Sequence, residues 1–369
     1  GLGTRRLTGA ATQQLANGGS ATLLVDEVEY GLEPHRLVHL LSYLKDKDAF
    51  SQVFITTPSP TALRHLEPDD LAMVRATAAG TTYVRSLGDP PSLRPLLKTS
   101  PEAFLSRRIV INEGKTEYGV VLEHLDEWDA DTEPDAVPSA ALGVVAIEGN
   151  GGTGSAGRAA QFLNLGYDVV LFIDSDDENA NTLADQVAAD GGAVIRWEGD
   201  HSIETAVCAE LTEAGLTAFI ETAIEVADDP DSARTVYADT LVANGAPDSD
   251  AGAETLDVSS WAAAGVDLDQ ARDIVGKSAK GKSWFKRVDK GRRLGRFILD
   301  SPDLEGGGVE SKIGALREAI YTPAEAEDMV ITMQATTTAE EPAATEEVIE
   351  VEAADPPGEN STTHEPPGV

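Results

Sequence analysis

The sequence alternates short, continuous apolar runs with longer amphipathic segments. Continuous apolar runs are typical of strands in a parallel sheet that is covered on both faces. From about residue 216 to 320 the pattern becomes mostly helical. The alternation predicts an α/β fold with a parallel sheet, followed by a helical C-terminal region. The predicted strands are 21–25, 53–56, 108–111, 142–147, 169–173 and 193–197, and the predicted helices between them are 36–45, 116–128, 181–190 and 202–215.

A cluster of acidic residues directly follows one predicted strand. Asp174, Asp176, Asp177 and Glu178 come immediately after the apolar run 169–173. So many acids in one turn repel each other unless cations lie among them. Alternate residues at a strand exit point to the same side, so Asp174 and Asp176 can face one metal zone. Their hard oxygen ligands suit Mg²⁺ or Mn²⁺.

A second pair of acids follows the strand predicted at 108–111. This strand ends in Glu113 and Gly114, and the glycine permits a tight turn into the next helix. Glu117 lies one helical turn further on, near Glu113. Glu113 and Glu117 thus form a second acidic element, upstream of the two aspartates.

A glycine-rich loop separates these two acidic elements and allows a different interpretation. Gly149, Gly151 and Gly154 fit the pattern G-x-G-x-x-G, between a predicted strand and a helix predicted at 156–165. Asp174 would then be the acid that binds a ribose in a dinucleotide fold. However, the glycine loop of that fold follows the first strand of the sheet, and here another strand comes first. We favour a structural role for these glycines, in a tight turn near the metal site.

The order of these elements resembles the Toprim domain of topoisomerases, primases and related nucleases. The resemblance covers about residues 107–200. It depends on the strand that ends in Glu113 and Gly114, the glycine-rich turn, and the D-x-D strand end about 60 residues further along the chain. It implies a Rossmann-like parallel sheet with a metal-dependent site at its carboxyl edge.

The N-terminal segment contains a Walker B pattern. Residues 21–29 (ATLLVDEVE) would present Asp26 to Mg²⁺ and Glu27 to the water that faces a γ-phosphate. Segments 1–7, 31–37 and 53–60 resemble the signature segment, D-loop and switch loop of ABC-type ATPases. In that family the switch loop usually carries His where this chain has Pro58, whose side chain has no donor, so we expect slow or absent hydrolysis.

The Walker A lobe of such an ATPase is expected upstream of Gly1. The fragment should therefore bind ATP well only together with that N-terminal lobe. A Walker A-like string does occur at 276–283 (GKSAKGKS). The preceding segment 267–275 reads as a helix rather than a strand, and the string follows the Walker B pattern instead of preceding it. We therefore do not interpret it as a phosphate-binding loop.

An ABC-type ATPase followed by a Toprim domain resembles the OLD (overcoming lysogenization defect) family of ATP-dependent endonucleases. The resemblance implies DNA hydrolysis with two Mg²⁺ or Mn²⁺ ions, gated by the nucleotide state of the ATPase, in DNA processing or phage defence. It also implies that the protein forms a homo-oligomer through the ATPase domain. A helicase-type partner protein is possible in such a system, but the sequence does not identify one. By the same resemblance, Glu113 and Glu117 would serve one metal zone, and Asp174 and Asp176 would serve the other or bridge the two. Glu204 would be a further metal ligand, and Lys282 or Lys286 would neutralise the transition-state charge.

The segment from Lys277 to Arg296 concentrates positive charge in an otherwise acidic chain. The chain has 64 acidic and 28 basic residues and a net charge of −36, so it should repel nucleic acid except where positive charge gathers or metal ions bridge phosphates. The segment is either a solvated helix face that balances nearby acids or a phosphate contact surface. Its DNA-binding candidates are Lys277, Lys280, Arg287, Arg292 and Arg293.

Composition also bounds the class of protein. A hydrophobic content of 41% is enough for a hydrophobic core. No apolar run reaches the ~20 residues that a membrane-spanning helix needs. Because Cys208 is the only cysteine, an intrachain disulfide is excluded. We expect a cytoplasmic protein without a membrane partner. The predicted parts are the ATPase portion 1–85, a linker 86–105, the Toprim domain 106–225, a helical region 226–325 and a disordered acidic tail 326–369.

Two other functions stay open at this stage. A topoisomerase- or primase-like Toprim enzyme would need a partner domain that presents a nucleophilic tyrosine, and no such domain is evident. A non-catalytic assembly module derived from an ATPase is favoured by Pro58 but disfavoured by the intact acidic set at Glu113, Asp174 and Asp176. The acidic surplus itself suggests adaptation to high salt.

Overall fold

The structure is a computed structural model of the 369-residue chain. It describes residues 22–45, 52–76, 82–88, 93–131, 136–248 and 253–322, together with Gly9. The chain divides into two units, Gly1–Glu327 and Asp328–Val369. The predicted tail 326–369 and the predicted signature segment 1–7 lie outside the described residues.

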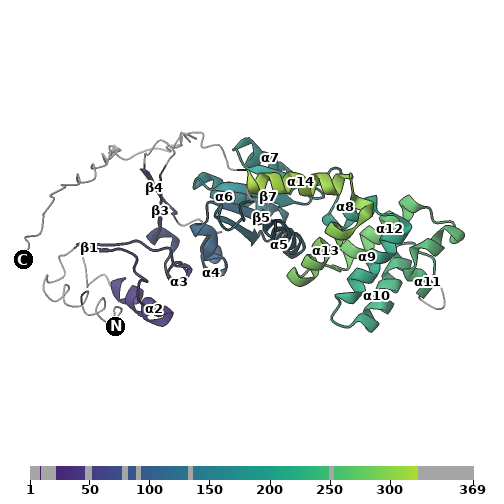
Figure 1. Ribbon diagram of the computed structural model, residues 1–369, viewed down its shortest axis with the longest axis horizontal. Helices are drawn as coiled ribbons and strands as arrows, with labels where there is room; N and C mark the ends of the chain where they lie inside the picture. The colour runs from purple at the N-terminus through teal and green to yellow at the C-terminus, as the bar shows by residue number, and fades with distance from the viewer. Residues whose placement is uncertain are drawn as a thin grey trace, which may run out of the picture. The chain divides into compact units, whose positions relative to one another are not determined.

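A four-stranded parallel sheet forms the centre of the first unit (Figure 1). Its strand order is β6-β5-β7-β8, so β5 and β7 are the inner strands and each is flanked by a partner on both sides. The register aligns Ile109 with Val145 on one side and with Val169 on the other. The strands are β5 (Arg108–Asn112), β6 (Val144–Glu148), β7 (Asp168–Ile173) and β8 (Ala193–Arg196).

Both faces of this sheet are buried, as the continuous apolar runs predict. Val110 and Phe172 join a core that extends into the C-terminal helices, whereas Ile109, Ile111 and Leu171 join a second core. Alternate side chains of a strand point to opposite faces, which explains this division. The helices between the strands are α5 (Lys115–Asp129), α6 (Gly152–Asn164) and α7 (Glu178–Ala189), and α8 (Ile203–Glu210) follows the last strand.

The N-terminal region contains two small sheets. Strands β1 (Thr22–Val25) and β2 (Gln52–Ile55) are parallel, as predicted, and helix α2 (Pro34–Leu44) packs against them through buried leucines. A short helix α3 (Pro60–Leu63) follows β2. The hairpin of β3 (Ala72–Ala76) and β4 (Thr82–Ser86) is antiparallel and was not predicted.

The proline-rich segment that we read as a linker contains ordered helices. Helix α4 (Leu93–Thr99) buries Leu93, Leu96 and Leu97 against the second core, and the 3-10 helix η2 (Pro101–Leu105) leads into β5. Prolines at the starts of such helices are tolerated because the first backbone N–H groups have no intrahelical partner. The segment is thus held to the sheet by apolar packing.

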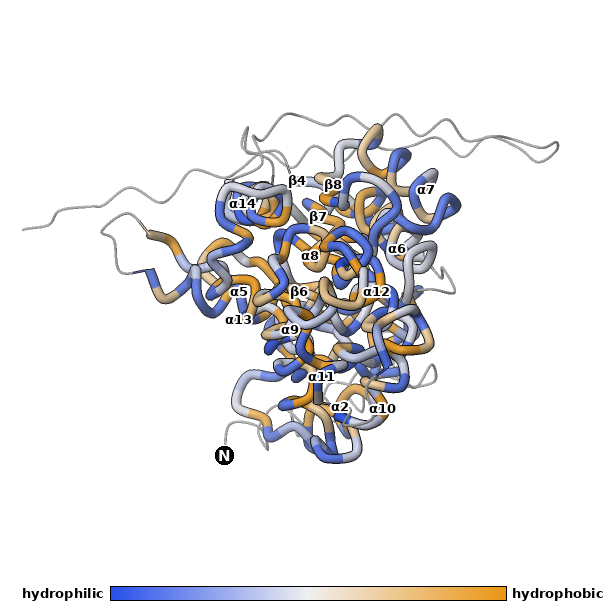
Figure 2. Tube along the Cα trace, turned by 90° about the vertical axis from the view of Figure 1, so that its right-hand side faces the viewer, coloured by the Kyte–Doolittle hydropathy of each residue, from blue (hydrophilic) through white to orange (hydrophobic). Residues whose placement is uncertain are grey.

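The C-terminal region is helical, as predicted, and its helices carry apolar stretches (orange in Figure 2) whose buried side chains join the first core. The helix predicted at 202–215 is interrupted, because Leu211 has an extended backbone and Thr212 caps a new helix. The Walker A-like string lies within and just after α12, which confirms that it forms no phosphate loop. The elements are α9 (Glu213–Glu225), α10 (Pro230–Ala243), α11 (Ala253–Leu256), η3 (Val258–Ala264), α12 (Leu268–Gly281), α13 (Val288–Asp300), η4 (Pro302–Leu304) and α14 (Gly308–Tyr321).

Large aromatic side chains pack in the core of this region. Trp284 and Phe285 are fully buried, Tyr237 stacks on Trp284 with ring centroids 4.4 Å apart, and Cys208 is also buried. None of the helices in the described ranges is both long and apolar enough to cross a bilayer.

Candidate functional site

The predicted acids lie where strands of the sheet end and helices begin. Glu113 directly follows β5, and Glu117 is in the first turn of α5. Asp174 and Asp176 follow the neighbouring strand β7, and Glu204 is in the first turn of α8, after β8. Because carboxyl ends of parallel strands meet at one edge of a sheet, the fold brings acids from three separate segments together.

Hydrogen bonds connect these segments through the carboxylates. The Asp174 N–H donates to Glu113 Oε2 over 2.9 Å, and the Ile203 N–H donates to Asp174 Oδ1 over 3.0 Å. Glu117 Oε2 accepts from the Gly114 N–H over 2.9 Å, and Glu204 Oε2 accepts from the Ser202 hydroxyl over 3.0 Å. Each of these four carboxylates is therefore oriented by a protein donor. The loops after β7 and β8 are also joined, since Ser175 and His201 exchange hydrogen bonds.

The cluster is buried and strongly self-repelling. Burial, and then the carboxylate of Glu204, raise the pKa of Glu117 to about 8. Burial is also the largest cause that raises the pKa of Asp174, Glu113 and Glu204, and the charge of Glu117 adds to the effect on Asp174. Loss of solvation and like charges both disfavour the ionised form. In such an environment, some of the carboxylates are either protonated or neutralised by a positive charge nearby.

Positive charge next to the cluster comes from the segment that connects α12 and α13. Lys280, near the end of α12, donates to Asp176 Oδ2 and lowers the pKa of Glu204 through its charge. Lys286 acts in the same direction on Glu113 and Glu204. The sequence favoured Lys282 or Lys286 as the charge-neutralising lysine and placed Lys280 only among the DNA-binding candidates. Lys282 is the exposed residue that ends α12.

The carboxylates do not already have metal-ligand geometry. Within the described part of the chain, no group of three or more His, Cys, Asp and Glu side chains is arranged so that it could hold a metal ion. The physical reason lies in the partners of these oxygens, which are backbone N–H groups, Ser202 and Lys280. Asp177 serves a different purpose, because its side chain caps α7 by accepting from the Asn179 and Ala180 N–H groups.

The glycine-rich loop closes tightly against this edge of the sheet. The Gly151 N–H donates to the Glu113 carbonyl over 2.9 Å, and a Cβ at Gly152 would lie 2.7 Å from the Ala180 Cβ and 3.6 Å from Glu113 Oε1. Gly149 approaches the Asn112 carbonyl so closely that a Cβ there would lie 2.4 Å from its oxygen. Since this loop follows the edge strand β6, its glycines permit close packing beside the acids.

The Walker B residues occupy a second site, at the end of β1. Thr56, which follows the parallel strand β2, donates its hydroxyl proton to Asp26 Oδ1 over 2.5 Å and accepts from the Glu27 N–H over 2.9 Å. Thr57 donates to Glu29 over 2.7 Å. The switch loop is thus bound to the Walker B turn through two threonines, and Pro58 follows them without contributing a side-chain donor.

The predicted DNA-binding cations are mostly engaged in ion pairs. Arg292 contacts Glu123 and Asp126, and Arg293 contacts Glu225. These pairs connect α13 to α5 and α9 and balance their acids, which favours the solvated helix face among the two interpretations. The remaining pairs are Lys277 with Asp273, Lys280 with Asp176, and Arg287 with Asp228 and Asp289.

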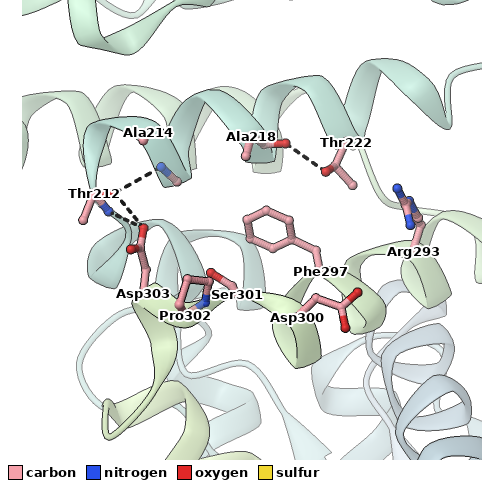
Figure 3. Close-up of a pocket in the computed structure, with 11 residues that line it drawn as sticks. Thr212, Ala214, Ala218, Thr222, Arg293, Phe297, Asp300, Ser301, Pro302 and Asp303 are labelled. Atoms are coloured by element: carbon pink, nitrogen blue, oxygen red, sulfur yellow. Dashed lines mark hydrogen bonds between the residues drawn. The ribbon is translucent and has the colours of Figure 1, made fainter.

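A cavity of about 400 Å³ lies between α9, α13 and η4 (Figure 3). Phe297 projects into it across from Ala218, and Arg293 lies at one end. At the other end, Asp303 Oδ2 accepts from both the N–H and the hydroxyl of Thr212, over 2.9 and 2.7 Å. Its lining includes none of the predicted metal ligands.

Comparison with known proteins assigns the N-terminal segment. A family model described as "AAA domain, putative AbiEii toxin, Type IV TA system" matches residues 1–64. No curated protein matches the chain. The matched range contains β1, Asp26, Glu27 and β2, and it supports an ABC-type ATPase region at the N-terminus. ATP with a divalent cation is accordingly the ligand class of that region.

Proposed function

We propose that this chain carries a metal-dependent DNA endonuclease site of the Toprim type, regulated by the ATPase region, as in the OLD family. The observation that supports this most is the convergence of buried carboxylates from three separate segments. Glu117 and Glu204 are only 6% exposed, and a fold gains no stability from burying two mutually repelling carboxylates without a positive charge between them. A buried cluster of this kind is expected where cations bind.

The donor chemistry of the cluster fits Mg²⁺ or Mn²⁺. Glu113, Glu117, Asp174 and Asp176 would hold the ions, with Glu204 as a further ligand, and all of them offer hard oxygen atoms. When bound, two such ions supply an activated water and stabilise the leaving oxygen of a phosphodiester. Because Lys280 occupies an oxygen of Asp176, binding requires that this lysine turn away from the carboxylate.

The protein's own groups would orient the site and neutralise charge. The Asp174 N–H fixes Glu113, and the Ile203 N–H fixes Asp174, so the two strand ends keep a set position relative to each other. Lys286 places a positive charge near Glu113 and Glu204, where it would lower the energy of a phosphate group that gains negative charge. The Walker B region would couple access to nucleotide binding.

The test is nicking of supercoiled plasmid in the presence of Mn²⁺. We expect nicked product from the wild-type protein and its loss in Asp174→Ala. Asp190→Ala is the matched control, because Asp190 is an exposed acid at the far end of α7. A second readout is the melting temperature, which Mn²⁺ should raise in the wild type and in the control but much less in Asp174→Ala. Absence of both cleavage and Mn²⁺ stabilisation in the folded protein would refute the proposal.

Pro58 favours one alternative, a non-catalytic assembly module derived from an ATPase. The residue lies in the switch loop, where it offers no donor to a γ-phosphate. The same assays distinguish this function, since a module would neither nick DNA nor gain stability from Mn²⁺ at the carboxylates.

A further inference from the structure

The cations near the carboxylate cluster fall into two groups. The arginines of α13 form ion pairs with acids of neighbouring helices, for example Arg292 with Asp126 over 2.6 Å. By contrast, Lys115, Lys286 and Lys290 have no ion-pair partner within the described ranges, and none of them is fully buried. Lys98 and Lys282 also lack an ion-pair partner in these ranges. What distinguishes the three lysines is therefore their place beside the start of α5 and the carboxylate cluster.

The connection between α12 and α13 holds Lys286 at the surface. Trp284 and Phe285, just before it, are anchored in the core with exposed fractions of 1% and 0%. Ser283 has a φ of 55°, which turns the chain sharply before this anchor. The Phe285 carbonyl accepts from the Thr116 hydroxyl of α5 over 3.2 Å. Lys286 is therefore exposed on a short segment whose position relative to the start of α5 is set.

Lys115 and Lys290 lie on two helices, α5 and α13, that cross closely. Helices α5 and α13 lie side by side in both views (Figures 1 and 2). A Cβ at Gly291 would lie 3.0 Å from the Lys115 carbonyl oxygen, and a Cβ at Gly119 would lie 2.4 Å from the Val288 carbonyl oxygen. Lys290 directly precedes Gly291, so it lies on the part of α13 that passes the start of α5.

Lys115 and Lys286 are next to the predicted metal ligands. Lys115 is two residues after Glu113, at the first position of α5. Lys286 is close enough to act electrostatically on Glu113 and Glu204. Lysines around an acidic edge, left without acidic partners, are suited to bind negatively charged groups of a ligand, and lysine contacts phosphates as a point charge.

We propose that Lys115, Lys286 and Lys290 form a lysine track that binds the phosphate backbone of duplex DNA beside the carboxylate cluster. The inference rests on the proposed nuclease function and replaces the paired cations as the principal DNA contacts. Backbone contacts of this kind position the duplex without reading its sequence. They also supply the local positive charge that an acidic chain needs in order to approach DNA.

The test measures binding of a fluorescent DNA duplex in the Asp174→Ala background with Mg²⁺, so that cleavage does not interfere. The test variant replaces Lys115, Lys286 and Lys290 with Gln. The control variant replaces Lys45, Arg234 and Lys312 with Gln, which gives the same change in net charge at cations paired with Asp70, Glu221 and Glu198. Circular dichroism and melting curves verify that both variants are folded.

We expect the test variant to bind DNA about tenfold more weakly or worse than the control. The slope of log K against log salt should fall by about 0.9 for each lost phosphate contact. Equal weakening in both variants would show that only net charge matters, and it would overturn the inference. A parent protein that binds no DNA would also overturn it.

The lysine track and the nuclease function can fail separately. If the wild type nicks DNA but the test variant binds it as well as the control does, the lysine track is wrong and the nuclease function stands. If the test variant loses binding but the wild type does not nick DNA, the nuclease function is wrong and the lysine track stands.

Discussion

His124 is a buried ionisable residue that makes the stability of the fold depend on pH. The imidazole is fully buried in α5, Nδ1 lies 2.8 Å from the Val120 carbonyl, and Nε2 has no hydrogen-bond partner within the described ranges. A carbonyl only accepts, so Nδ1 carries a proton, and Nε2 is the nitrogen that gains one when the ring becomes charged. Burial is the largest effect and lowers the pKa of His124; the Val120 carbonyl and Glu123 raise it by less, and the still smaller effect of Arg296 lowers it.

Acid should therefore destabilise the protein through His124. Its pKa is lower in the folded state than in the unfolded state, so its contribution to stability is present above the unfolded value of about 6.5 and is lost as the pH falls through the folded value. Each unit of lowering is equivalent to about 1.4 kcal/mol of unfolding free energy. Denaturation by urea between pH 7.5 and about 5 should show a decline in stability that is smaller in His124→Leu.

The control for this experiment is His35→Gln, because His35 is exposed on α2, with 74% of its side chain accessible. Its pH profile should match that of the wild type. Parallel profiles for all three proteins would contradict the assignment of a neutral, buried His124.

At the scale of elements, the α5–α13 crossing depends on glycines that face each other. A Cβ at Gly119 would lie 2.4 Å from the Val288 carbonyl oxygen and 2.7 Å from the Arg292 nitrogen, distances that backbone atoms cannot relieve without separating the helices. Gly119→Ala should therefore reduce the free energy of unfolding by about 1–3 kcal/mol, as overpacking does. It should also weaken Mn²⁺ binding, since α5 carries Glu117.

Gly157→Ala should have the opposite effect on the free energy of unfolding. Gly157 lies inside α6, and a Cβ at this position would meet no neighbouring atom within 4 Å. Alanine there should stabilise the protein by about 0.5–1 kcal/mol, because it loses less backbone entropy on folding. Equal effects of the two substitutions in thermal or urea denaturation would show that the crossing tolerates side chains.

At the scale of the whole molecule, the net charge of −36 governs stability in salt. Like charges repel each other over the folded surface, and salt screens them with a Debye length of about 10 Å at 0.1 M and about 3 Å at 1 M. We expect the melting temperature to rise strongly between dilute buffer and molar KCl, as in adaptation to high salt. Equal melting temperatures at both salt concentrations would contradict this expectation.

Much of the fold could be predicted from local patterns. The strands β1, β2, β5, β6, β7 and β8 were each visible as apolar runs, because a strand buried on both faces needs apolar residues on both. Acids placed directly after β5 and β7 were also visible, and parallel strands bring such ends together whatever the details of packing. The hairpin of β3 and β4 escaped prediction because its strands carry only partly buried side chains and resemble surface segments.

Tertiary structure decided which charges neutralise one another. Lys280 and Asp176 are 104 residues apart, and Arg292 contacts acids 166 and 169 residues away, so no local pattern could pair them. The same holds for Gly119 and Gly291, whose small size matters only because two helices cross there. Sequence by itself determined the α/β class and the acids at the strand ends, since both follow from nearest-neighbour periodicity. The partners of the lysines and the closeness of the helices depend on contacts between distant segments, which only the folded chain specifies.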